Sequence, residues 1–245
     1  MRTVIQISAA FLVLDGRDKS PLREASVLVD GGRRRCFRKG DGHIVFTDLP
    51  AVEHTFEITA SGFRPARRTF RSGAGALPEV VVMQYAADSL RLAGINHYRF
   101  RFTKEGTPLA EGQVQVTLLT GCGALRVVDG AKKGRQTLAL SGGYAPMLLY
   151  QDYEAGGTEM LLTGYDRGSG CYELREPLGK ALAAGTALHP RWTLDTDREG
   201  TAVLPGVGLL MEREELEFSF ETEGAQTKKL TLPPPAGACP AAVEF

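Results

Sequence analysis

The chain has 245 residues, with 29 basic and 29 acidic side chains, so its formal net charge is zero. This balance gives no general attraction to nucleic acid or to an anionic membrane, and the 43% hydrophobic content excludes a generally disordered chain. No stretch reaches the ~18 apolar residues that a membrane-spanning helix needs. The 29 glycines and 13 prolines predict many turns, and therefore the short strands of an all-β fold with little helix.

The chain opens with a largely apolar stretch, residues 1–14, which has one basic residue as a signal peptide would. Gln6 and Ser8 interrupt the stretch, and no small-residue cleavage site follows before Asp15. We therefore predict a strand here rather than a signal peptide. The localisation stays open. With no leader or transmembrane segment recognised, we expect cytoplasmic synthesis and incorporation into a larger assembly.

A Gly-Asp-Gly turn at residues 40–42 leads into an alternating stretch at residues 43–47. Asp and Gly both tolerate the positive φ angles of a tight hairpin. Every second side chain of the stretch faces the same side of a strand, and residues 55–60 predict the strand that follows. We expect the alternating apolar residues to build the core of a β-sandwich: Val27, Val29, Ile44, Phe46, Phe56 and Ile58.

A Pro-Leu-x-x-small-x-Val-x-Val pattern occurs at residues 21–29 and again at residues 108–116. The proline leaves a turn, and the valines alternate onto a buried face. A weaker copy at residues 177–181 keeps only the start, while the turn-strand-proline pattern of residues 40–50 recurs at residues 195–206. This recurrence is domain-sized and typical of sandwiches. It predicts three tandem β-sandwich domains: residues 1–86, 87–170 and 171–245, the last with a proline-rich tail.

The first segment carries a recognisable order of features: Leu14-Asp15, Pro21-Leu22, Ala25 to Val29, Gly40-Asp41-Gly42, Leu49-Pro50, Phe56 to Ala60 and Gly62-Phe63. This order resembles the carboxypeptidase regulatory-like domains, which belong to the transthyretin-like (prealbumin-like) group of seven-stranded sandwiches. The second segment looks more like a bacterial Ig-like domain, and the third like a degenerate relative of either. The resemblance implies scaffolding, adhesion or substrate presentation rather than catalysis.

Two relatives of this fold carry chemistry, and the sequence departs from both. Self-crosslinking pilin-type domains place a lysine in the first strand and an Asn or Asp in the last, but residues 7–14 lack the first and residues 79–84 lack the second. Hydroxyisourate hydrolase opens with His-Val-Leu-Asp, and here Leu12 stands in place of the histidine general base. We predict no catalytic residues and expect the protein not to be an enzyme.

The four cysteines, Cys36, Cys122, Cys171 and Cys239, are far apart and form no Cys-x-x-Cys pair. This spacing favours free thiols over a metal site or a disulfide framework, although whether the cysteines pair is left open. The four histidines share no metal-binding spacing. Residues 195–200 partly match a calcium loop, but its twelfth position would be Gly206, so we interpret the stretch as a hairpin turn. No metal site and no cofactor are predicted.

Basic side chains concentrate at residues 33–39 and 64–71. If two neighbouring strand edges carry them, they would form one patch for a protein partner, for the acidic segment 171–245 of another copy, or for an anionic glycan. The few interleaved aromatic residues disfavour nucleic acid. The alternative is that the charges only protect edge strands from aggregation. The predicted binding residues are Arg33, Arg34, Arg35, Arg38, Arg64, Arg67, Arg68 and Arg71.

The sequence thus favours a non-catalytic structural and interaction protein, such as a part of a bacterial surface, secretion or phage-tail-like assembly. An alternative is a carbohydrate-binding protein that uses aromatic side chains as stacking platforms. A second alternative is an enzyme with a site built between domains, which the sequence does not reveal. The aromatic candidates for the carbohydrate-binding alternative are Trp192, Tyr144, Tyr150 and Tyr153.

Overall fold

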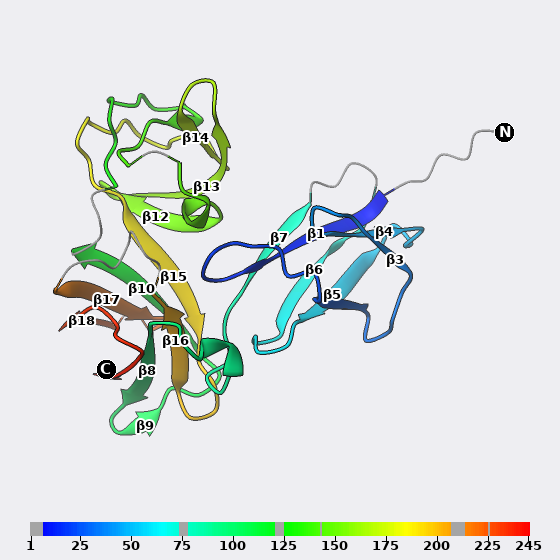
Figure 1. The fold of residues 1–245 in the computed structure, drawn as a ribbon, viewed down its shortest axis with the longest axis horizontal. Coiled ribbons are helices and arrows are strands. Elements are labelled where there is room, and N and C mark those ends of the chain that lie inside the picture. Colours follow the sequence, from blue (N-terminus) through cyan, green and yellow to red (C-terminus); the bar gives the residue numbers. More distant parts are fainter. Residues whose placement is uncertain (1–6, 74–77, 121–124, 143, 207–213, 225) are drawn as a thin grey trace. The chain divides into compact units, whose positions relative to one another are not determined.

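The computed structural model of the chain describes residues 7–73, 78–120, 125–142, 144–206, 214–224 and 226–245 (Figure 1). These residues are nearly all in strands and loops, which confirms the predicted all-β fold. The chain divides into two compact units, which we call unit 1 (Met1–Arg91) and unit 2 (Leu92–Phe245). The helical elements within the described residues are the short 3-10 helices η1 (Leu90–Leu92) and η2 (Pro146–Leu148). No helix found there is long and apolar enough to cross a membrane.

Unit 1 is a two-layer β-sandwich. One sheet has the strand order β3-β4-β1-β7, and the other has the order β2-β5-β6. The first strand, β1, lies between β4, which is antiparallel to it, and the last strand, β7, which is parallel to it. The strands are β1 (Ile7–Asp15), β2 (Ser26–Val29), β3 (Cys36–Arg38), β4 (His43–Thr47), β5 (Glu53–Thr59), β6 (Ala66–Arg71) and β7 (Glu79–Met83).

Aromatic rings from both sheets fill the core of unit 1. The ring of Phe56 stacks on that of Phe70 with centroids 4.7 Å apart, and the Phe11 ring lies 4.9 Å from Phe56. Such contacts add to the stabilisation that burial of each ring already gives. The six core residues predicted from alternation are all buried, which confirms that prediction: Val27, Val29, Ile44, Phe46, Phe56 and Ile58.

The predicted hairpin at residues 40–42 joins β3 to β4. Gly42 has a φ of +95°, and a Cβ atom there would lie 2.4 Å from the Cβ of Pro21. Both the backbone conformation and the close approach therefore require glycine at this position. The contact also shows how the hairpin packs against the Pro-Leu start of the segment that leads into β2.

Unit 2 contains a similar sandwich. One sheet has the order β16-β8-β19 with β9 paired to β8, and the other has the order β11-β14-β13-β12-β15-β10-β17-β18. Its strands are β8 (His97–Lys104), β9 (Thr107–Pro108), β10 (Gln113–Thr120), β11 (Thr137–Leu138), β12 (Gln151–Ala155), β13 (Thr158–Asp166), β14 (Cys171–Leu174), β15 (His189–Asp195), β16 (Thr201–Pro205), β17 (Leu216–Thr222), β18 (Thr227–Leu232) and β19 (Ala238–Glu244).

The two units share one strand order. In unit 2, β8 lies between the antiparallel β16 and the parallel β19, as β1 lies between β4 and β7. Likewise β10-β17-β18 corresponds to β2-β5-β6. The recurring sequence patterns at residues 108–116 and 195–206 therefore occupy the places of residues 21–29 and 40–50 in the fold. The strand that precedes the turn-strand pattern is placed differently in the two units. In unit 1 this strand is β3 and pairs with β4, whereas in unit 2 it is β15 and pairs with β10 of the other sheet.

The structure differs from the predicted division between residues 170 and 171. The β13–β14 hairpin runs through that point, with Asp166 paired to Cys171. In addition β10, from the predicted second domain, pairs with both β15 and β17 from the predicted third. Residues 125–188, which we call the inserted segment, lie between β10 and β15 and include β11 to β14. The weak copy at residues 177–181 belongs to this segment and forms no strand there.

Candidate functional site

The two arginine-rich stretches lie on opposite edges of the unit 1 sandwich. Arg38, on edge strand β3, donates hydrogen bonds to the backbone oxygens of Arg23, at 2.9 Å, and Ala25, just before β2. Arg68, on edge strand β6, is 3.5 Å from Glu79 on β7. One edge is therefore formed by β3 and β2, and the other by β7 and β6. The two stretches therefore do not form the expected single patch, because they lie at opposite edges of the sandwich.

The β6 stretch has carboxylates beside its arginines. Arg67 and Arg71 face outward, directly opposite Glu57 and Glu53 of β5 in the antiparallel register. Opposite charges at facing positions stabilise a strand pair by a few tenths of a kcal/mol to about 1 kcal/mol. Arg68 is engaged with Glu79 on the neighbouring strand. This edge is therefore close to locally neutral, which favours the edge-protection interpretation for Arg67, Arg68 and Arg71.

The β2–β3 edge carries a local excess of positive charge. Arg33, Arg34 and Arg35 lie in the loop that enters β3, and all three are exposed. Arg35 lies over the ring of Phe37, 5.4 Å from its centroid, and Phe37 is itself 43% exposed. The nearby carboxylates are Asp30, Asp41 and Glu24, and Glu24 is paired with Arg91. We call this surface the basic edge, and define it by Arg23, Arg33, Arg34, Arg35, Arg38 and Lys39.

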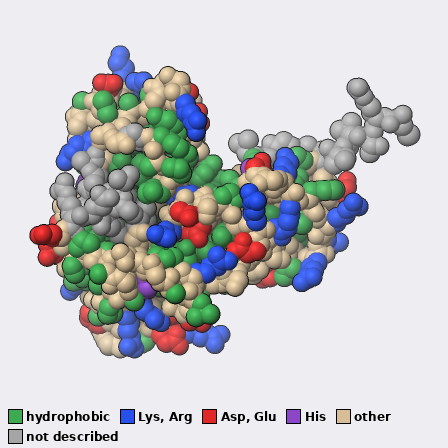
Figure 2. All heavy atoms as spheres, viewed as in Figure 1, with side chains coloured by type: hydrophobic (Ala, Val, Ile, Leu, Met, Phe, Trp, Pro, Cys, Tyr) green, Lys and Arg blue, Asp and Glu red, His purple; other side chains and the backbone are tan. Residues whose placement is uncertain are grey.

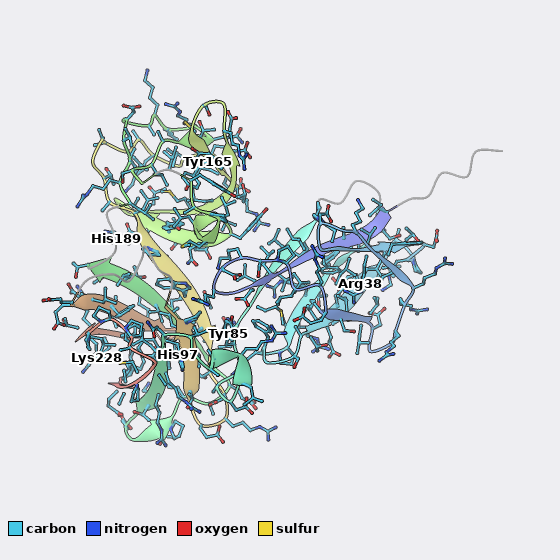
Figure 3. The ribbon with its side chains drawn as sticks, viewed as in Figure 1. Arg38, Tyr85, His97, Tyr165, His189 and Lys228 are labelled. Atoms are coloured by element: carbon cyan, nitrogen blue, oxygen red, sulfur yellow. The ribbon has the colours of Figure 1, made fainter. Side chains whose placement is uncertain are left out.

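Arg38 has a structural role within the basic edge (Figure 3). Its side chain crosses from one sheet to the start of the other, where its guanidinium donates to two backbone oxygens. Arginine suits this position because its planar group presents several donors in a fixed geometry. Arg33, Arg34 and Arg35, by contrast, lie exposed in the loop that enters β3.

A group of acidic side chains gathers at one end of unit 2. Glu105 lies in the β8–β9 turn, and Glu244 near the end of β19 accepts a hydrogen bond from the Gly106 amide at 3.0 Å. Glu111 and the β15–β16 turn adjoin, because the Glu111 amide bonds the Asp197 carbonyl at 3.1 Å. Lys104 and Arg198 are the basic residues of these turns. We call this surface the acidic end, defined by Glu105, Glu111, Asp195, Asp197, Glu199 and Glu244.

The predicted hairpin turn at residues 195–200 is present. One carboxylate oxygen of Asp197 accepts hydrogen bonds from the amides of Glu199, at 3.0 Å, and Thr201, at 2.7 Å. The side chain thus completes its own turn, as Asp commonly does. Within the described part of the chain, no group of three or more His, Cys, Asp or Glu side chains is arranged to hold a metal ion.

The aromatic candidates fall into different environments. Tyr153 is fully buried and its hydroxyl is 3.2 Å from the Leu148 carbonyl, so it cannot serve as a platform. Trp192 is partly buried against the core of unit 2. Tyr144 is 44% exposed and its ring lies 4.8 Å from that of Tyr165, which in turn contacts the buried Tyr172. Tyr150 is partly buried. Among the four candidates Tyr144 therefore presents the exposed ring, and Tyr165 packs beside it.

Cys36, Cys171 and Cys239 are free, and Cys122 lies outside the described residues.

Figure 2 shows basic and acidic side chains interspersed over the visible surface, as the zero formal charge leads one to expect. The sequence pointed to the Arg33–Arg35 loop. It did not point to the acidic end, because the acidic end is assembled from turns far apart in the chain.

No protein-family profile matches the sequence, and no curated protein matches it significantly. Among solved structures, the Bacillus anthracis TIE protein is 10% identical, and the match covers 98% of this chain and 34% of that one with a TM-score of 0.27. The major pilin subunit of Bacillus cereus is 11% identical, with 95% and 69% covered and a TM-score of 0.26. A further likeness is to the SGBP-B protein of the Bacteroides ovatus mixed-linkage glucan utilization locus, which is 12% identical, with 99% and 68% covered and a TM-score of 0.15. These likenesses are too weak to carry an argument about function.

Proposed function

We propose that the chain is a non-catalytic structural and interaction protein whose two β-sandwich units act in series within a larger assembly. The observation that carries this proposal is the parallel pairing of the first and last strands in each unit, β1 with β7 and β8 with β19. Because paired parallel strands run in the same direction, the chain enters each unit at one end of the pair and leaves at the other. A bacterial surface, secretion or phage-tail-like assembly needs modules of this kind.

This geometry suits a module that bears load. Tension applied at the start of β1 and the end of β7 pulls the two strands past each other rather than apart. The register joins five residue pairs, from Phe11 with Glu79 to Asp15 with Met83, and the β8–β19 register joins seven. Each backbone hydrogen bond contributes only about 0.5–1.5 kcal/mol net. When the two strands are pulled past each other, many of these hydrogen bonds bear the force together. When a hairpin is opened from its end, the hydrogen bonds break one after another.

Side chains reinforce both strand pairs near their ends. The hydroxyl of Tyr85, just after β7, is 2.9 and 2.8 Å from the two carboxylate oxygens of Asp15 at the end of β1. In unit 2, the carboxylate of Glu244 on β19 accepts hydrogen bonds from the hydroxyl of Thr103 and the amide of Gly106. Both contacts fasten the last strand of a unit to its first strand, which supports a role in holding the chain together under tension.

The type of each domain is a further part of the proposal. We infer that unit 1 is a carboxypeptidase regulatory-like domain of the transthyretin-like group. The Pro-Leu start at residues 21–22, the Gly-Asp-Gly hairpin at residues 40–42 and the seven-stranded order support this. The sandwich of unit 2 fits an Ig-like domain that carries an insertion. Such domains serve mostly as scaffolds, which agrees with the structural role proposed.

Single-molecule force measurement tests the proposal. Unit 1 pulled through handles at Ile7 and Tyr85 loads the parallel pair, whereas handles at Glu53 and Arg71, which face each other at the open end of the β5–β6 hairpin, unzip it. We expect a clearly higher unfolding force in the first geometry. Equal forces in the two geometries would remove the load-bearing argument and leave the proposal without its support.

A second candidate function, carbohydrate binding, rests on the Tyr144–Tyr165 pair. It lies on the inserted segment, which has no counterpart in unit 1, and segments added to a rigid scaffold frequently carry binding residues. A glycan array probed with the full chain and with the Tyr144→Ala variant tests this candidate. Binding that the variant loses would support it, and an array with no binding would leave the structural role alone.

A further inference from the structure

The Arg33–Arg35 loop presents three exposed arginines in succession, with Arg35 placed over the ring of Phe37. The other basic residues of the basic edge add to the same field, and the carboxylates near it are Asp30, Asp41 and Glu24, the last of which is paired with Arg91. Arginine binds carboxylates well because its planar group can donate two parallel hydrogen bonds. The partner that fits this surface is therefore one that presents several carboxylates close together.

The acidic end of unit 2 has that character. Its acids stand in three adjoining turns whose backbones are fixed by hydrogen bonds, from the Glu111 amide to the Asp197 carbonyl and from the Gly106 amide to Glu244. Six carboxylates stand there against the basic side chains of Lys104, Arg198 and Lys228, and the carboxylates of Glu105 and Glu199 are exposed at the tips of their turns. Because the turns are held in place, a partner need not order their backbones, and only the side chains lose freedom on binding.

We propose that the basic edge of unit 1 binds the acidic end of unit 2 of a second copy, so that copies join head to tail. The inference rests on the proposed structural role and adds the surfaces through which copies meet. Two different surfaces of one chain form such a contact, so one contact between two copies leaves a basic edge and an acidic end free, and the contact can repeat from copy to copy. The opposite charges lie on the two units of every chain, and this makes a second copy the natural partner.

Individual exposed ion pairs contribute only about 0–1 kcal/mol, so the contact depends on several arginine–carboxylate pairs acting together. It also depends strongly on salt, because the Debye length falls from about 30 Å at 0.01 M to about 3 Å at 1 M ionic strength. Association is therefore expected at low salt and high protein concentration, and is expected to disappear at high salt. This salt dependence distinguishes the contact from an apolar interface.

Sedimentation velocity of the full chain over a concentration series, at low salt and at about 1 M salt, measures the association. Two charge-reversal variants test the surfaces separately. The first is Arg33→Glu/Arg34→Glu/Arg35→Glu, and the second is Glu105→Lys/Glu111→Lys/Glu199→Lys. A control matched to the first variant, Lys132→Glu/Lys133→Glu/Arg135→Glu, makes the same change in net charge as that variant in an exposed turn of the inserted segment.

We expect the wild-type chain and the control to associate at low salt, and each reversal variant alone to stay monomeric. An equimolar mixture of the two reversal variants should recover association, because the reversed surfaces complement each other. The proposal would be overturned by a wild-type chain that is monomeric at every salt concentration, by association that salt does not weaken, by a control that loses association equally, or by a mixture that stays monomeric.

A monomeric wild-type chain that heparin beads retain through Arg33, Arg34 and Arg35 would likewise overturn the second-copy contact, in favour of an anionic glycan. None of these results bears on the force measured for a single unit. A chain that resists force but never associates would therefore refute this contact and leave the structural role standing.

Discussion

The Nδ1 atom of His54 lies 2.6 Å from the Oδ2 atom of Asp30, which joins β5 to the turn that follows β2. The other ring nitrogen, Nε2, lies 3.0 Å from the backbone carbonyl oxygen of Pro50. An ionised carboxylate and a carbonyl only accept hydrogen bonds, so both contacts are satisfied only when both ring nitrogens carry protons. The hydrogen bond to Asp30 raises the pKa of His54, while burial opposes this, and the same bond lowers the pKa of Asp30.

Unit 1 is expected to lose stability as the pH rises through the raised pKa of His54. A group that binds its proton more tightly in the folded state stabilises that state most below its unfolded pKa, here 6.5, and the stabilisation disappears above the folded pKa. Asp30, with its lowered pKa, adds stability that is lost at acid pH. Urea unfolding of residues 1–91 at about pH 5 and about pH 8, followed by far-UV circular dichroism, measures the difference.

The Asp30→Asn variant should reduce this loss between the two pH values, because the carboxylate that holds the imidazolium is gone. Asp48→Asn, at an exposed position of the same unit, is the matched control and should leave the pH dependence unchanged. A wild-type fragment that is equally stable at both pH values would contradict the role given to the His54–Asp30 contact.

Replacing Phe46 with alanine should destabilise unit 1 by about 3–5 kcal/mol, because the ring is fully buried and a cavity would remain. The ring contacts that would be lost include those to Phe11, at 6.2 Å between centroids, and Phe56, at 6.1 Å. Urea unfolding of residues 1–91 gives the change in the free energy of unfolding. A loss below about 1 kcal/mol would show that the Phe46 ring is not packed as described.

Tyr85→Phe should lower the stability of unit 1 by about 1–3 kcal/mol, because the buried carboxylate of Asp15 loses a hydrogen-bond donor. Burial and the nearby Asp15 also raise the pKa of Tyr85, so the hydroxyl keeps its proton over the physiological range. A double-mutant cycle with Asp15→Asn isolates the pair. If the two single effects simply add, the two side chains do not interact and the tie between β1 and β7 is absent.

Arg38→Ala should cost roughly 0.5–1.5 kcal/mol, because the guanidinium no longer bonds the backbone oxygens that precede β2. Arg33→Ala, its neighbour in the basic edge, should change stability by less than about 0.5 kcal/mol, as exposed substitutions usually do. Unfolding of the two variants side by side checks this division between a structural and a binding arginine. Equal effects would mean that the division is wrong.

The sequence indicated the β-sandwich of unit 1 because the signals are local. Alternation over residues 43–47 identified Ile44 and Phe46 as core residues, and the glycine turn marked where the hairpin closes. The prediction divided unit 2 after residue 170, whereas the structure shows one unit, because the strand pairings that join its parts are not local. The pairing of Gln113 with Asp195 joins strands that the inserted segment separates, and no local pattern reports it. The inserted segment also contains turns, and in the sequence these resemble the turns between two domains.

The candidate site was predicted only in part for a similar reason. Arginine-rich stretches are visible in the sequence, but the sheet that each strand joins decides whether they meet. The register that places Glu57 opposite Arg67 depends on the β5–β6 connection, whose turn type the sequence did not fix. The acidic end depends on three turns brought together by the fold, so its residues gave no signal before the fold was known.

Deleting the inserted segment tests most directly whether the chain is two copies of one strand order. The antiparallel register of β10 and β15 brings Thr120 close to His189, so a hairpin loop of about 2–5 residues can replace residues 121–188. Far-UV circular dichroism and urea unfolding of the shortened unit 2 should show a cooperatively folded all-β domain. An unfolded or non-cooperative product would contradict this, because it would mean that the sandwich cannot fold without the buried residues of the inserted segment, which belong to the same hydrophobic cluster.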